Sequence, residues 1–296
     1  MREFTEEKLV SKKIAFVLVH GAWHSSATWS HISDAIQMTG YNVITLDLPG
    51  AGRYAKWPLC ATHRPFDSQA YAEELSPNAY VTQDDRTQAV VNLLENYEDT
   101  ENTDFILVGH SLGGITISAV AQALPHKIKA LVYLCAYLVP PGATTSSIRQ
   151  HSTMASSKIP GLQLANPAKI GALRINPLSE DKAYIDKLRE AFAADLSAAE
   201  FTAELSQMHS DEPAQPVREP STLTPERGGK VPRYYLRTLY DAAMPIAAQD
   251  YMIGRADSEL GGKTQIYTLE TGHTPQCTQP SRVIEILINI ASKNTF

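Results

Sequence analysis

The chain has 296 residues, 43% of them hydrophobic, and a formal net charge of -6 at pH 7. This length is enough for one large core with an inserted subdomain. The negative charge argues against a basic face that would hold nucleic acid or an anionic membrane surface. The composition therefore predicts no nucleic-acid and no membrane partner, and it favours a small neutral or weakly polar ligand.

The apolar segments also bear on where the protein resides. The first 16 residues, MREFTEEKLVSKKIAF, are charged and lack the apolar stretch of a signal peptide. The longest apolar run, ALVYLCAYLV, has about half of the roughly 20 residues that a membrane-spanning helix requires. We therefore expect a soluble, cytoplasmic protein.

The cysteines indicate neither a disulfide framework nor a zinc site. Cys60, Cys135 and Cys277 are odd in number and lack metal-ligand spacing. Cys135 lies inside an apolar run, as expected of a residue that fills the core.

Short apolar runs alternate with helical patterns along most of the chain. Strands are predicted at residues 14–19, 41–48, 104–109, 128–138, 231–240 and 264–270, and helices at 26–38, 84–96, 111–124, 246–253 and 279–292. The strand runs are apolar nearly throughout, which is typical of strands buried on both faces of a parallel sheet. This order predicts an α/β protein with a doubly wound, mostly parallel sheet of about six strands.

Residues 140–230 interrupt this alternation with a segment rich in Pro, Ser and Ala. One helical face would carry Tyr184, Ile185, Leu188 and Phe192, and a capping box of Ser197 and Glu200 would begin a second helix with Phe201, Leu205 and Met208. We predict a helical cap at 140–230, between core segments 1–139 and 231–296. The alternative is a set of surface helices without a lid role.

Two parts of the chain are candidates for shaping a ligand pocket. In the 140–230 segment, the apolar residues Ile159, Leu162 and Leu164 are such candidates. Residues 53–79 follow the second predicted strand and are too long for an ordinary connection. They either line the ligand entrance or form a decorated loop.

The sequence Gly109-His110-Ser111-Leu112-Gly113 falls between a predicted strand and a predicted helix. This is the context of a nucleophile elbow, a strained turn that exposes a serine at the carboxyl edge of the sheet. Side chains at Gly109 and Gly113 would collide with the neighbouring strand and helix, and Gly114 extends this requirement for small residues. The alternative is a tight turn with an incidental serine.

A serine hydroxyl is a weak nucleophile, so Ser111 needs a base and the base needs an orienting acid. Of the nine histidines, His273 alone follows the last predicted strand, on a loop that can reach back over Ser111. Asp241 ends the preceding strand and is the candidate acid. Its other possible role is that of an N-cap for the helix after Pro245.

The first predicted strand ends at His20-Gly21, which places the backbone N–H of Ala22 opposite the elbow. Together with the N–H of Leu112, it is a candidate for the oxyanion hole. Trp23 is a candidate pocket wall, with a packing role as the alternative. The candidate pocket residues are Gly21, Trp23, His24, His110 and Thr274.

The segments LVHGAWHSSATW, LDLPGAG, LVGHSLGG, YDAAMPIAAQ and ETGHTPQCTQP together resemble the α/β-hydrolase superfamily. Within it, the chain is similar to the group of plant methylesterases, hydroxynitrile lyases and bacterial pyrethroid-type carboxylesterases. The resemblance implies a serine esterase that cleaves an ester of a small, largely apolar substrate through an acyl-enzyme intermediate. Ser111 would be the nucleophile, His273 the general base and then acid, and Asp241 the orienting group. It implies no metal and no organic cofactor.

Other activities of this superfamily differ at single positions. Dehalogenases and epoxide hydrolases use an aspartate nucleophile, whereas residue 111 is a serine. The lyases carry Thr at the position of Gly21 and Lys at that of Thr274, so both distinctive side chains are absent. A ligand-binding receptor that retains the triad, and acyl transfer to an acceptor other than water, remain alternatives.

Overall fold

The computed structural model describes residues 12–293. The expectation drawn from the first 16 residues therefore falls largely on residues 1–11, which lie outside the described range. Within residues 12–293, no helix combines the length and the apolar composition that crossing a bilayer would require.

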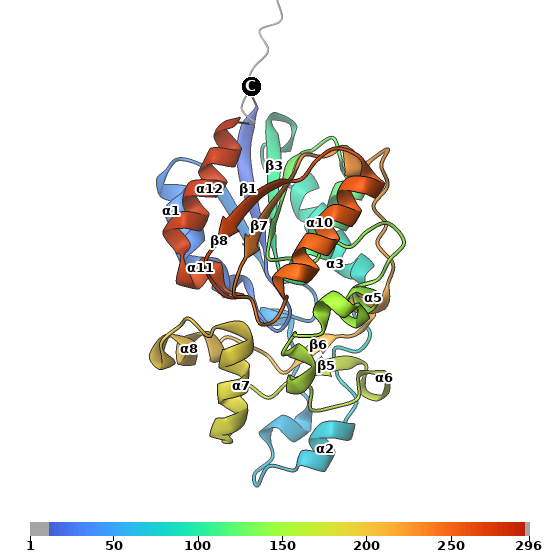
Figure 1. Cartoon of the computed structure of the whole chain (residues 1–296), viewed down its shortest axis with the longest axis vertical. Coiled ribbons are helices and arrows are strands. Elements are labelled where there is room, and N and C mark those ends of the chain that lie inside the picture. The colour runs from blue at the N-terminus through green and yellow to red at the C-terminus, as the bar shows by residue number, and fades with distance from the viewer. Residues whose placement is uncertain (1–11, 294–296) are drawn as a thin grey trace, which may run out of the picture.

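A six-stranded parallel sheet forms the centre of the molecule, in the order β2-β1-β3-β4-β7-β8 (Figure 1). Its strands are β1 Lys13–Val19, β2 Asn42–Leu46, β3 Thr103–His110, β4 Ile128–Leu134, β7 Arg233–Thr238 and β8 Gln265–Leu269. Val19 pairs with Gly109, which in turn pairs with Tyr133, so that β1, β3 and β4 end at the same edge. The predicted α/β class and the parallel sheet of six strands are confirmed.

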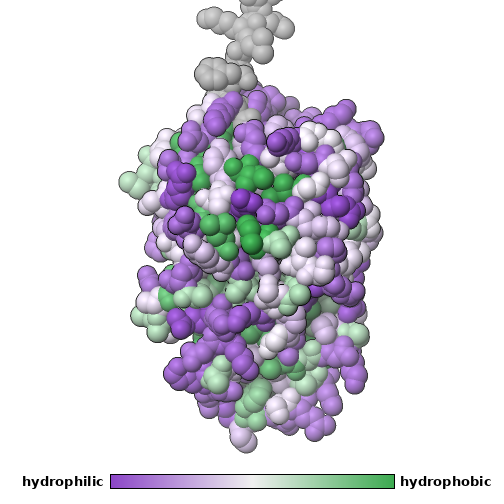
Figure 2. All heavy atoms as spheres, viewed as in Figure 1, coloured by the Kyte–Doolittle hydropathy of each residue, from purple (hydrophilic) through white to green (hydrophobic). Residues whose placement is uncertain are grey.

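Helices cover both faces of the sheet, each with its own apolar core. The helices of the sheet domain are α1 Ser30–Met38, α3 Gln83–Glu95, α4 Gly113–Ala123, α10 Ile246–Leu260, α11 Pro275–Thr278 and α12 Pro280–Lys293. Apolar residues of α1 and α12 pack on one face, and those of α3, α4 and α10 pack on the other. Figure 2 shows polar side chains over much of one side of the molecule, with an apolar area in the upper half between α12 and α10.

Three predicted elements differ from the structure by more than two residues at one end or are divided. β4 ends at Leu134 rather than at residue 138, because Cys135 has a φ of 36° and the chain leaves the sheet there. The apolar run continues to Val139 because these residues are buried, although they are not in a strand. α10 extends seven residues beyond the predicted end at 253, through a stretch that begins with Gly254 and is largely polar. The predicted helix at 26–38 is divided into a 3₁₀ turn, Ser26–Trp29, and α1.

Residues 140–230, which we call the cap segment, lie for the most part beyond the carboxyl ends of the strands, and residues 224–230 return along the C-terminal end of α4 to the start of β7 (Figure 1). They contain α5 Thr145–Gln150, α6 Pro167–Ile170, α7 Lys182–Phe192, α8 Ala198–Leu205 and α9 Gln215–Arg218. The capping box of Ser197 and Glu200 begins α8 as predicted. No sequence pattern indicated the small two-stranded antiparallel sheet formed by β5 Ala172–Arg174 and β6 Asp211–Pro213, which α7 and α8 separate along the chain.

Residues 53–79 pack against the cap segment. They include α2 Ser68–Glu73, and the Tyr71 hydroxyl donates to the Ile175 carbonyl at 2.8 Å. The Ser76 N–H donates to the Ile170 carbonyl, and the Arg174 guanidinium donates to the Tyr71 carbonyl. These contacts make the connection a support for the cap segment, a role that differs from both the entrance lining and the decorated loop considered from the sequence.

Candidate active site

Ser111 lies on a tight turn between β3 and α4. Its φ is 50°, a left-handed conformation that is uncommon for a residue other than glycine. A Cβ added to Gly109 would lie 2.8 Å from the Gly113 carbonyl oxygen, and one added to Gly113 would lie 2.6 Å from the His20 carbonyl oxygen. A Cβ on Gly114 would lie 2.5 Å from the Tyr137 carbonyl oxygen. The backbone packing therefore excludes side chains on both sides of the serine.

Ser111, His273 and Asp241 form a continuous hydrogen-bonded series. His273 Nε2 lies 2.8 Å from Ser111 Oγ, and His273 Nδ1 lies 2.7 Å from Asp241 Oδ2. All three residues are buried. Since a carboxylate only accepts, Asp241 selects the tautomer with the proton on Nδ1, which leaves the lone pair of Nε2 facing the serine hydroxyl.

Asp241 also organises the turn that follows β7. Its Oδ1 accepts from the N–H groups of Ala243 and Met244 at 2.8 and 2.7 Å, and the Thr238 hydroxyl donates to Oδ2 at 3.0 Å. The N-cap position of α10 is Pro245 and receives no side-chain hydrogen bond. Asp241 is therefore not the N-cap of this helix, and its hydrogen bonds hold the carboxylate in one orientation toward His273.

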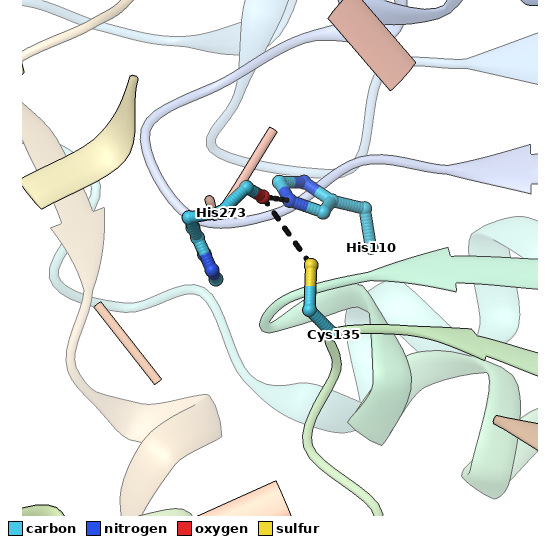
Figure 3. Close-up of side chains that lie close together, drawn as sticks. All are labelled: His110, Cys135 and His273. Carbon is cyan, nitrogen blue, oxygen red and sulfur yellow. Dashed lines mark hydrogen bonds between the residues drawn. The ribbon is translucent and has the colours of Figure 1, made fainter. Parts of the chain in front are cut away.

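Two further side chains form hydrogen bonds to the backbone of His273 (Figure 3). His110 Nε2 lies 2.7 Å from the His273 carbonyl oxygen, and the Cys135 thiol donates to the same oxygen at 3.3 Å. Burial lowers the pKa of His110 and raises the pKa of Cys135, so both groups are neutral. Candidate metal-ligand atoms of these three residues lie within 4.8 Å of one another. However, both ring nitrogens of His273 face Ser111 and Asp241, and the other two side chains face its carbonyl, so hydrogen bonding accounts for the cluster.

The loop that carries His273 is also held by the cap segment. Asp195, between α7 and α8, accepts from the Gly272 N–H at 3.0 Å and from the Thr271 hydroxyl. The Thr274 hydroxyl donates to the Phe192 carbonyl at 3.1 Å. The cap segment therefore contacts the residues on both sides of the histidine.

The turn after β1, residues 20–24, faces the elbow, and we call it the oxyanion turn. A Cβ on Gly21 would lie 2.8 Å from Ser111 Cβ, so the absence of a side chain there allows the close approach. The N–H groups of Ala22 and Leu112 donate to no protein acceptor within residues 12–293, and both residues line the cavity beside Ser111. Two unpaired N–H groups at this place are what a developing oxyanion requires.

A narrow cavity that is partly open to solvent lies above Ser111. Its walls come from the core and from the cap segment, and they are Ala22, Trp23, His24, His110, Leu112, Tyr137, Thr145, Arg149, Ile159, Leu173, Phe192, Val217, Ala243, Met244 and His273. Trp23, His24 and His110 therefore lie where the sequence placed them, whereas Gly21 and Thr274 are not among the lining residues. No residue of 53–79 lines this cavity.

The three apolar residues of the cap segment that were candidates for shaping the pocket have different positions. Ile159 lines the cavity, whereas Leu162 is buried without lining it, and Leu164 packs beside the cluster of Cys60 and Tyr71. Sequence reasoning missed Arg149, Phe192 and Met244 as lining residues. The sequence contained an indication for Phe192, because this residue lies on the apolar face of a predicted helix of the cap. Arg149 and Met244 had none, because a residue's approach to a cavity depends on how the segments fold over one another.

The model of the alpha/beta hydrolase family matches residues 16–286 of the chain. A pyrethroid hydrolase of Sphingobium wenxiniae is 28% identical over 275 residues, covering 93% of this chain and 86% of that protein. A putative chloroplastic methylesterase of Arabidopsis thaliana, number 14, is 24% identical over 290 residues, covering 98% of this chain and 74% of that protein.

Solved structures give the same fold. The crystal structure of a pyrethroid hydrolase from Sphingobium faniae superposes with a TM-score of 0.71 at 24% identity, covering 95% of this chain and 98% of that chain. Polyneuridine aldehyde esterase superposes with a TM-score of 0.70 at 18% identity, covering 95% of this chain and all of the other. At such identities the superpositions concern the fold alone.

Proposed function

Because the chain belongs to the alpha/beta hydrolase family, we propose that it is a serine esterase acting on a small, largely apolar ester through an acyl-enzyme intermediate. The observation that carries the proposal is the buried series Ser111, His273 and Asp241 below a cavity with two unpaired N–H groups. The names of two relatives, a pyrethroid hydrolase and a putative methylesterase, support the same reaction class.

The geometry is suited to a two-step acyl transfer. Ser111 Oγ attacks the ester carbonyl carbon while its proton passes to His273 Nε2, and Asp241 stabilises the resulting imidazolium. The carbonyl oxygen becomes an oxyanion that accepts from the N–H groups of Ala22 and Leu112. The alcohol leaves with the proton from His273. Water then gives a proton to the same imidazole and its oxygen attacks the acyl carbon, and the imidazolium returns the proton to Ser111 Oγ as the acid leaves.

The cavity walls favour an apolar ester with, at most, one negative group. Apolar walls include Tyr137, Ile159 and Leu173, and Arg149 is the one Arg or Lys side chain among the lining residues, with no carboxylate beside it. Apolar walls with few polar groups are typical of small-molecule sites. Arg149 offers an ionic contact to an acid group placed away from the scissile bond.

The lyase alternative is disfavoured by the packing of the oxyanion turn. A side chain at Gly21 would require the backbone to shift, since its Cβ would lie 2.8 Å from Ser111 Cβ and 3.0 Å from His110 Nδ1. Thr274 is neutral and directs its hydroxyl to the Phe192 carbonyl, so the residue that follows the base supplies no cation. Departing cyanide would therefore lack the charge that the lyases carry at this position.

Labelling with a fluorophosphonate, followed by turnover of p-nitrophenyl esters of increasing acyl length, tests the proposal. We expect the label on Ser111 and turnover of short neutral esters. Ser111→Ala should lose the label and about 10⁴-fold or more in kcat, because little beyond the oxyanion hole remains. Ser258→Ala, which changes an exposed serine of α10, is the control and should behave as wild type.

Three outcomes would contradict the esterase assignment. Absence of both label and turnover would show that Ser111 is not a nucleophile. A labelled protein without turnover would favour a ligand receptor, and cyanide release from mandelonitrile without ester turnover would favour a lyase.

The role of Arg149 is tested separately. The Arg149→Gln variant should lose about tenfold in kcat/KM on an ester with a terminal carboxylate and stay within about twofold on its neutral counterpart.

A further inference from the structure

Trp23, in the oxyanion turn, is held by the cap segment through three hydrogen bonds. Its backbone N–H donates to Glu212 Oε2 at 3.2 Å, and its carbonyl accepts from the His209 N–H at 3.0 Å. Its indole N–H donates to the Leu173 carbonyl at 2.8 Å. The φ of Trp23 is 59°, which a bulky residue adopts only when its surroundings require it. The cap segment therefore maintains an unfavourable backbone conformation in the core.

The residue whose position depends on this conformation is Ala22. The Gly21 carbonyl lies 2.8 Å from His20 Nδ1, and His20 Nε2 accepts from the Leu48 N–H, so the ring proton is on Nδ1. In a trans peptide the C=O and N–H point in opposite directions, so this bond turns the Ala22 N–H away from His20. The next peptide is held at its carbonyl by His24 Nδ1 at 2.7 Å and at its N–H by Glu212.

Glu212 is itself held in place by the core. Arg86, on α3, donates from a terminal nitrogen to Glu212 Oε1 at 2.6 Å, and the two side chains are 3% and 0% exposed. The Arg86 Nε donates to the Pro49 carbonyl, which ties the guanidinium to the loop after β2. A buried pair of this kind stabilises little by itself, but it holds each partner in one position.

We propose that Glu212 is a positioning residue for the oxyanion hole, so that the cap segment completes the catalytic site as well as covering it. The proposal rests on the esterase function proposed above. Arg86 holds one carboxylate oxygen, the other holds the Trp23 N–H, and the Ala22 N–H is thereby aimed at the oxyanion. Glu212 does not touch the substrate, so its effect should appear in the transition state rather than in substrate binding.

The test compares Glu212→Gln with wild type on a p-nitrophenyl ester and on a trifluoromethyl ketone. Ser111 Oγ adds to the carbonyl carbon of this ketone, and the oxygen becomes an alkoxide in the oxyanion hole. Gln cannot accept from both Arg86 and Trp23, because one of its ends is a donor. Loss of a whole oxyanion donor costs about 10²- to 10³-fold in kcat, so a misplaced one should cost about 10- to 100-fold. We expect KM within about twofold and ketone affinity reduced in parallel with kcat.

Asp211→Asn is the matched control, because Asp211 precedes Glu212 in the same strand, β6. Asp211 forms a bidentate pair with Arg174, both side chains being 0% exposed, and Arg174 also donates to the carbonyls of Tyr71 and Glu74. Within residues 12–293, none of these groups forms a hydrogen bond with residues 20–24. This variant should lower Tm as much as Glu212→Gln does, while its kcat and ketone affinity stay near those of wild type.

Wild-type kcat and ketone affinity in folded Glu212→Gln would overturn the positioning role and leave the esterase function intact. Equal losses of kcat in Glu212→Gln and Asp211→Asn would also overturn it, because they would indicate that the whole β5–β6 sheet is destabilised. If the Gln variant does not fold, Glu212→Asp keeps the charge for Arg86 but withdraws it from Trp23, and a wild-type kcat there would be equally decisive. Absence of ester turnover in the wild type would remove both proposals.

Discussion

The nucleophile elbow and the oxyanion turn face each other across the cavity but are held in different ways. The elbow is held by the core: the Ser111 N–H donates to the Leu134 carbonyl at 3.2 Å, and the Ser111 carbonyl accepts from the Tyr137 N–H at 2.9 Å. The oxyanion turn instead depends on the cap segment, through Glu212 and His209. One half of the site is therefore built by the sheet, and the other requires a segment inserted far along the chain.

This difference explains why the two halves are unequally visible in the sequence. The elbow depends on steric limits within a few residues, which appear as glycines on both sides of Ser111. The oxyanion turn depends on a carboxylate 189 positions away from Trp23. No pattern among neighbouring residues of the sequence indicates such a contact.

The elbow can be broken most severely by adding one methyl group. In Gly113→Ala, the new Cβ would lie 2.6 Å from the His20 carbonyl oxygen and 2.7 Å from that of Val19, and neither backbone oxygen can move without displacing β1. We expect loss of more than about 4 kcal/mol in the free energy of unfolding, or no folded protein. Gly161→Ala is the control, since nothing lies within 4 Å of its Cβ. Urea unfolding measures both, and similar stabilities would contradict the steric account.

Asp241→Asn should separate the orientation of the base from the integrity of the elbow. The amide oxygen of Asn can still accept from the Ala243 and Met244 N–H groups, so the turn should persist. The amide NH₂ would then face His273 Nδ1 and favour the wrong tautomer, at a cost of about 10⁴-fold in kcat. The rate of p-nitrophenyl ester turnover measures the loss, and circular dichroism should show unchanged folding. Near-normal turnover would exclude Asp241 from the triad.

Acid should act on the oxyanion turn through His20. Burial lowers the pKa of His20 from 6.5 to about 4, and protonation would set its Nε2–H against the Leu48 N–H. The pKa of His20 is lower in the folded state than in the unfolded chain. The contribution of the neutral ring to the free energy of unfolding is therefore complete above about pH 6.5 and is lost as the pH falls toward 4. We expect about 2 kcal/mol less stability at pH 5 than at pH 7 from this group. His20→Gln, which cannot titrate, should show a shallower dependence in urea unfolding, and an unchanged slope would contradict this role.

The sequence predicted the parts of the molecule that follow from periodicity and chain order. The proximity of Ser111, Asp241 and His273 could be predicted because each lies at or beyond the carboxyl end of a strand that could be recognised. The two-stranded sheet β5–β6 was missed because strands of three residues are too short to show an alternation of apolar and polar residues. Glu212 and Asp195 were missed because an acidic residue is usually solvated, and only the packing of the cap segment shows that each is held against a loop of the candidate site.

The carboxylates of Asp195 and Glu212 limit how far the cap segment can serve as an interchangeable module. One holds the loop of His273, and the other holds the turn of Ala22, so both connections would be cut in a chimera that received a foreign insertion at 140–230. Such a chimera would lose rate on every ester, whatever the shape of its new pocket. Transplanting specificity into this enzyme therefore requires that the donor segment bring acidic groups to these same two places, or that the recipient loops be redesigned to hold themselves.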